Sequence, residues 1–240
     1  MSLLIPFAVA LLSGFVHGSI GMGYGIISMS LMPLVYDYTD AAAIVSIPIF
    51  IVSAQICWSI RGSIDWKTAR LPCATLTAGK ALGVVLLMNL TSSVLQMVLG
   101  LFLAAYAASQ LLGRTRFQLR GTPEQGIALN FIGGLLAGMI NIAGPLSSIY
   151  FQAVCGEDKE KYSACMNIAF LPATVIGLIL HVLYGNFRIG RLGEYAAMTV
   201  GTLIATHLGL IVLKWVPVKI MRLFTLCFVG IMGVFLCLSR

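Results

Sequence analysis

Two glycine-broken apolar segments, residues 14–28 and 134–148, carry the side chains best suited to bind a small solute. The candidate binding residues of the first segment are Ser19, Gly21, Gly23, Tyr24, Gly25 and Ser28. Those of the second are Asn141, Gly144, Pro145, Ser147 and Ser148. Ser46 and Asn167 occupy matching places in the helices that follow. Hydroxyl, amide and backbone N–H donors in this pattern suit a solute that presents acceptor oxygens.

A break in an apolar helix leaves backbone N–H and C=O groups without partners, which is tolerated at membrane depth only inside protein or beside water. Glycine permits the left-handed angles of such a turn. Helices that begin near Gly25 and Pro145 would direct free N–H groups and a partial positive charge at the breaks. Two such ends that meet predict an anion site. The alternative is that these small residues serve close helix packing.

Two ionisable residues are candidates for a charge or proton role. Lys80 is the one basic residue well inside a predicted span, and a charge at the centre of a bilayer costs ~2.5 kcal/mol or more. The alternative for Lys80 is that it reaches an interface or a helix end. His17 could move protons, although a structural role fits it as well. Asp37 and Asp40 flank a turn, so we expect both to face water.

The composition identifies a protein embedded in lipid. The chain has 240 residues, of which 59% are hydrophobic and 10% charged, whereas about a quarter of a soluble domain is charged. The net charge of +7 comes from short loops between apolar runs, so it does not indicate nucleic-acid binding. The six cysteines contain no CxxC pair, and we expect buried, inert thiols. No metal or other cofactor is predicted.

The apolar runs predict an all-α, polytopic membrane protein. The expected helices are 3–35 (interrupted), 40–60, 67–88, 92–112, 126–154 (interrupted), 161–184, 191–213 and 217–238. Matching motifs divide the chain into a first repeat (1–112), a linker (113–125) and a second repeat (126–240). Pro48 and Pro172 match in the second helices, and Gly83 matches Gly209.

The first helix of each repeat poses a length problem, because 33 residues of helix span ~50 Å against a hydrocarbon core of ~30 Å. Each could be one kinked span or a re-entrant hairpin. With hairpins, eleven of the fifteen basic residues fall on one side, and the positive-inside rule favours that arrangement. Three crossings in each repeat then make the two repeats inverted, with both termini outside the cytoplasm.

The repeated opener 18–25, the proline-bearing second helices and the pattern Leu208-Gly209 followed by 217–224 resemble the sulfite exporter (TauE/SafE) family of bacterial membrane proteins. The likeness covers nearly the full chain. It implies secondary transport of sulfite, sulfonates or related sulfur oxyanions without ATP, in the bacterial inner membrane.

Together, these features predict a secondary transporter that binds a small sulfur oxyanion at mid-membrane between the broken helices. An anion channel of the same architecture is the alternative. An enzyme is not expected, because HExxH, GxSxG and paired intramembrane carboxylates are absent. The expected partners are the small anion and the lipid bilayer, with no nucleic acid; a homodimer is left open.

Overall fold

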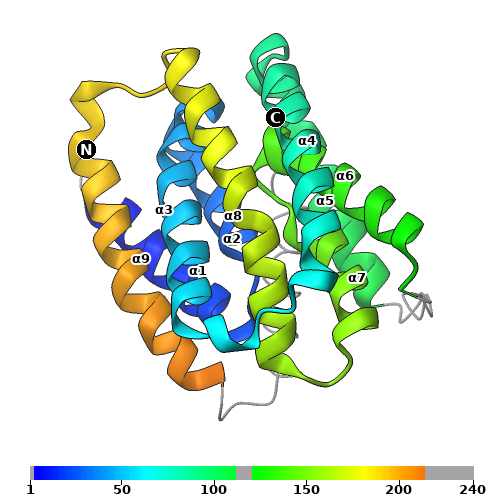
Figure 1. The fold of residues 1–240 in the computed structure, drawn as a ribbon. Helices are drawn as coiled ribbons and strands as arrows, with labels where there is room; N and C mark the ends of the chain where they lie inside the picture. The colour runs from blue at the N-terminus through cyan, green and yellow to red at the C-terminus, as the bar shows by residue number, and fades with distance from the viewer. Residues whose placement is uncertain (1–2, 112–120, 214–240) are drawn as a thin grey trace.

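The computed structural model describes residues 3–111 and 121–213, and the secondary structure of that part of the chain is helical, without strands (Figure 1). The elements are α1 (Leu4–Ile20), α2 (Tyr24–Leu31), η1 (Met32–Leu34), α3 (Tyr38–Ser59), η2 (Arg61–Ser63), α4 (Trp66–Asn89), α5 (Ser92–Leu111), α6 (Pro123–Ile140), α7 (Gly144–Cys155), α8 (Lys159–Leu183), η3 (Ile189–Arg191) and α9 (Leu192–Leu213). Four helical stretches are long and apolar enough to cross a membrane, namely α3, α4, α8 and η3 with α9. The predicted helix 217–238 lies outside the described residues.

Both helix breaks fall where the sequence pattern predicts them. Gly21–Gly23 separates α1 from α2, and Asn141–Ala143 separates α6 from α7. Helix α6 begins three residues earlier than predicted, because Thr122 and Gln125 form a reciprocal capping box around its start. The linker expected at 113–125 therefore already contains the first turn of α6.

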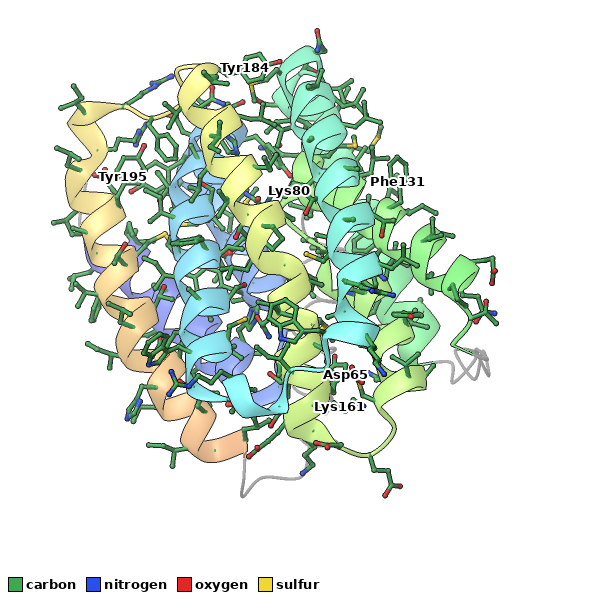
Figure 2. All side chains as sticks on the ribbon, viewed as in Figure 1. Asp65, Lys80, Phe131, Lys161, Tyr184 and Tyr195 are labelled. Carbon is green, nitrogen blue, oxygen red and sulfur yellow. The ribbon has the colours of Figure 1, made fainter. Side chains whose placement is uncertain are left out.

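Ion pairs fix which loops share an end of the bundle. At one end, Asp40 near the start of α3 pairs with Arg188 (3.2 Å) and Arg191 (2.6 Å), which follow α8. At the other, Asp65 after α3 pairs with Lys161 at the start of α8 at 2.9 Å. Figure 2 shows Asp65 and Lys161 together at one end, with Tyr184 and Tyr195 at the opposite end. Hence α3 and α8 run in opposite directions, as do α4 and α9.

The prediction that Asp40 faces water is wrong. Its side chain is 4% exposed and is enclosed by the two arginines. The partners come from a loop about 150 residues away in the chain, so the sequence around Asp40 could not indicate them. Asp37 is exposed, as expected.

Each broken segment returns to the end of the bundle from which it started. Leu3, just before α1, contacts Gly193 at the start of α9. Tyr36, after α2, lies under the guanidinium of Arg191, 4.8 Å from ring centroid to carbon. In the second segment, Gly121 before α6 lies against Val154 near the end of α7. The two ends of each broken segment therefore lie close together.

The first helix of each broken segment packs against a helix from the other half of the chain. Glycines line both of these contacts. Backbone of α1 meets backbone of α9 at Gly18 and Gly209, and α6 meets α4 at Gly138 and Gly83. A Cβ atom on Gly18 would come within 2.6 Å of the Thr206 carbonyl oxygen. Such glycine-lined contacts are typical of close helix pairs in membranes.

Candidate functional site

A small cavity lies where the two breaks meet. Its volume is about 40 Å³, room for about three water molecules or a solute of similar size. Polar lining comes from His17, Tyr24, Lys80, Asn141 and Thr174. The cavity takes residues from both broken segments and from α3, α4 and α8.

The two breaks touch each other through backbone. A Cβ atom on Gly25, in the first turn of α2, would collide with the carbonyl oxygen of Asn141. Reciprocally, a Cβ on Gly144, the first residue of α7, would lie 3.2 Å from the Cβ of Met22. Position 25 therefore requires glycine so that the two backbones can approach closely. Its own backbone is helical, so no left-handed angle is the reason. The N-termini of α2 and α7 thus line one cavity, and neither is capped by its N-cap side chain.

Side chains from α1 and α8 hold the first break in place. Gly21 (φ +79°) and Gly23 (φ +111°) have left-handed backbone, which glycine adopts without steric cost. His17 Nδ1 accepts the backbone N–H of Tyr24 at 3.2 Å. Its Nε2 must therefore carry the proton, and it donates to Asn167 Oδ1 at 3.0 Å. Asn167 Nδ2 in turn donates to the Gly21 carbonyl at 3.1 Å.

The second break is held by its own side chain. Asn141 has φ +55° and is the one non-glycine residue with positive φ among the described residues. Its Nδ2 donates to the Ala42 carbonyl of α3 at 3.0 Å. Its Oδ1 accepts from Lys80 Nζ at 3.5 Å. Asn141 thereby connects the break, the start of α3 and the lysine of α4.

Lys80 is a buried cation without a carboxylate partner among the described residues. Its side chain is 3% exposed, and Asn141 is the hydrogen-bond acceptor that it has there. No Asp or Glu lines the cavity. Removing an ammonium from water costs several kcal/mol unless a counter-charge or hydrogen bonds compensate. Among the described residues, the amide oxygen of Asn141 is the one group that offsets this cost for Lys80.

The predicted serines do not line the cavity. The hydroxyls of Ser19, Ser28, Ser46 and Ser148 donate to carbonyl oxygens three or four residues earlier in their own helices, at 2.6–2.9 Å. Ser147 is buried with no partner for its hydroxyl, and it faces Gly133 of α6. Gly21, Pro145 and Asn167 lie outside the lining as well. Asn167 reaches the site indirectly, through His17.

Of the predicted residues, the structure brings seven to the cavity wall: His17, Gly23, Tyr24, Gly25, Lys80, Asn141 and Gly144. The apolar lining was not predicted; it is Ile26, Ile49, Leu76, Ala137, Ile142, Ala143, Phe170 and Ala173. Thr174, a weaker candidate from the sequence, is the remaining polar wall residue. Apolar side chains in apolar helices carry no sequence signal that separates a cavity wall from a lipid-facing position. No group of three metal-ligating side chains occurs within the described residues.

Long apolar helices, and a buried cation in the cavity between two helix breaks, define a multi-pass membrane protein with an internal polar site. The family model described as "Sulfite exporter TauE/SafE" matches residues 6–236. The chain therefore belongs to the sulfite exporter TauE/SafE family of membrane transporters. Comparison with curated proteins and with solved structures finds no match.

Proposed function

We propose that this protein is a secondary transporter for a small sulfur oxyanion, such as sulfite or an organosulfonate. The anion binds in the cavity between the two breaks and crosses by alternating access. The observation that carries the proposal is Lys80, a buried ammonium beside both breaks with no carboxylate in contact among the described residues. An oxyanion would supply the missing negative charge and accept from the N–H groups of α2 and α7.

The proposal includes a depth near the middle of the membrane. The wall residues Ile49, Lys80 and Phe170 each lie within a few positions of the midpoint of a candidate span, α3, α4 and α8 respectively. Broken helices that place their N-termini at this depth are the usual anion sites of secondary transporters.

We further propose that the chain is an inverted repeat whose α1–α2 and α6–α7 segments are re-entrant hairpins. Two observations support this. Each segment begins and ends at the same end of the bundle. The corresponding helices α3 and α8 run in opposite directions, as the pairs Asp40–Arg188 and Asp65–Lys161 require. With a kinked single span in each repeat, those partners would lie on opposite sides of the membrane.

The same arrangement assigns the compartments. The end that carries Arg61, Lys67 and Lys161 would face the cytoplasm, following the positive-inside rule. The membrane would be the bacterial inner membrane, with lipid around the exposed apolar faces. No nucleic-acid partner is proposed, and association into a homodimer is compatible with those faces.

The test is a flux assay on the full chain in liposomes, with ³⁵S-labelled sulfite. We expect saturable uptake with counterflow, as for a carrier; large single-channel currents would indicate a channel instead. Lys80→Gln should lower the affinity for sulfite at least 30-fold, because the counter-charge is lost, whereas Lys80→Arg should retain part of it.

The matched control is Val85→Gln, on an exposed apolar position of the same helix. It should leave the affinity for sulfite unchanged. Wild-type rates in Lys80→Gln, with the control also active, would contradict the proposed site.

A further inference from the structure

A line of buried polar residues runs along one face of α8, past the cavity. Asn167, Thr174 and His181 are spaced by seven residues, which places them on one side of a helix. Their side chains are 0%, 4% and 1% exposed. On another side of the same helix, Ile179 and Val182 are 48% and 62% exposed. Helix α8 thus buries a polar face and turns an apolar face outward, the reverse of a helix in a water-soluble protein.

Lys80 lies against this line between Thr174 and His181. Thr174 is part of the cavity wall. At Gly177, a Cβ atom would come within 2.6 Å of Lys80 Cε and 3.3 Å of its Nζ, so the absent side chain at 177 makes room for the ammonium. His181 is one turn further along α8 and within electrostatic reach of Lys80. Beyond it, the chain continues to Arg188 at the end of the bundle that also carries Asp40.

His181 offers a hydrogen-bond donor that the described residues leave unused. The Nδ2 of Asn186 lies 3.0 Å from His181 Nδ1. An amide nitrogen donates, so Nδ1 accepts and the ring proton is on Nε2. No acceptor for Nε2 occurs among the described residues. The ring of Phe187 packs edge-on against the imidazole, 6.2 Å between centroids, and helps to hold its orientation.

We infer that Lys80 and His181 form a second oxyanion station, through which the anion passes between the cavity and the end of the bundle that carries Asp40 and Arg188. The inference rests on the proposed transport function and adds to it a path for the anion along α8. Lys80 and His181 each supply an N–H donor, and neither side chain pairs with a carboxylate among the described residues, a chemistry that suits sulfite or the head group of a sulfonate. His181 assists the movement of the anion through the protein, whereas the cavity at the two breaks remains the primary binding site.

The experiment measures sulfite binding to the purified full chain and, separately, the maximal rate of ³⁵S-sulfite flux in liposomes. His181→Leu should reduce the maximal flux at least tenfold while the dissociation constant for sulfite stays within threefold of the wild-type value. His181→Gln retains an N–H donor and should recover flux to within about threefold of the wild type. Val182→Phe, the outward-facing neighbour, is the matched control and should transport normally.

Wild-type flux in His181→Leu would overturn the inference and leave the proposed function intact. Absence of saturable sulfite flux in the wild type would instead refute the proposed function. Should His181→Leu fail to fold, Gly177→Val carries the same test, because the added side chain narrows the passage beside Lys80. A folded Gly177→Val protein with wild-type maximal flux would also overturn the inference.

Discussion

The two breaks are equal in length, and each begins with a left-handed residue, but they differ in how they complete the turn and in how they are stabilised. In the first, two left-handed glycines make the turn, and the amide that fixes it is contributed by Asn167 of α8. In the second, the left-handed residue is Asn141, whose own amide binds the Ala42 carbonyl of α3. In both, an amide joins the break to the second helix of the other half. The breaks differ in the charge of the groups that contact them. Lys80 contacts the second break, whereas the polar contacts of the first break are with neutral groups.

This difference suggests that the halves divide two tasks. The first break is a positioning element, since its polar contacts are made within the protein through His17 and Asn167. The second break brings a cation to the cavity and leaves that cation without a counter-ion among the described residues. Substitutions at the two breaks should therefore differ in effect on binding and on stability.

The largest effect is expected where the breaks touch. Gly25→Ala places a methyl group against the Asn141 carbonyl. Because the atoms that it meets belong to the backbone, they cannot move aside as a flexible side chain could. We expect sulfite flux to fall at least 100-fold. The contrast is Gly144→Ala, whose methyl group would meet the flexible side chain of Met22 and should cost less than tenfold. Equal effects of the two variants would contradict the asymmetry of this contact.

The next effect tests the missing counter-charge at the second break. Asn141→Asp would place a carboxylate beside Lys80, where Oδ1 now lies 3.5 Å from Nζ. The new carboxylate would compete with the substrate, so the dissociation constant for sulfite should rise at least 30-fold. The donor to the Ala42 carbonyl is lost, but the new ion pair with Lys80 offsets part of that loss, so the melting temperature should fall less than in Asn167→Ala. Isothermal titration and a melting curve measure the two quantities. Unchanged affinity would show that Lys80 does not face the anion.

A smaller effect on transport is expected at the first break, together with a larger effect on stability. Asn167→Ala removes the donor to the Gly21 carbonyl and the acceptor for His17. Each buried group left without a partner costs about 1–3 kcal/mol, so the melting temperature should drop clearly. Affinity for sulfite should change less than in Asn141→Asp. The reverse order of affinities would contradict the division of tasks.

The smallest effect is expected at an ion pair remote from both breaks. The pKa of Asp65 is lowered to about 2, first by its hydrogen bond with Lys161 and then by that with Thr68. A lowered folded-state pKa means that the pair contributes stability above about pH 4 and loses it as the pH falls toward 2. Lys161→Gln should weaken this acid dependence in melting experiments and leave sulfite flux at neutral pH unchanged. Because the pair is solvent-accessible, the shift should be slight and should decrease with salt.

Sequence patterns located the breaks and their glycines, because a polar or glycine-rich interruption is conspicuous in an apolar segment. They also identified Lys80, since a lone charge in such a segment demands an explanation. They did not show that the serines bond to carbonyls of their own helices, because serine type alone does not distinguish local bonding from ligand binding. Nor could they reveal the role of Gly25, which depends on the carbonyl of Asn141, far away in the chain. Tertiary contacts of this kind decide which predicted residues face the cavity.

The glycine-lined contact between α1 and α9 has a consequence for biosynthesis. Helix α1 finds its partner only after about 190 further residues have been synthesised. Until then, its glycine face, including Gly14 and Gly18, has no native backbone to pack against. A truncated chain that ends before α9 should therefore expose this face to other membrane helices and be an early target for quality-control proteolysis.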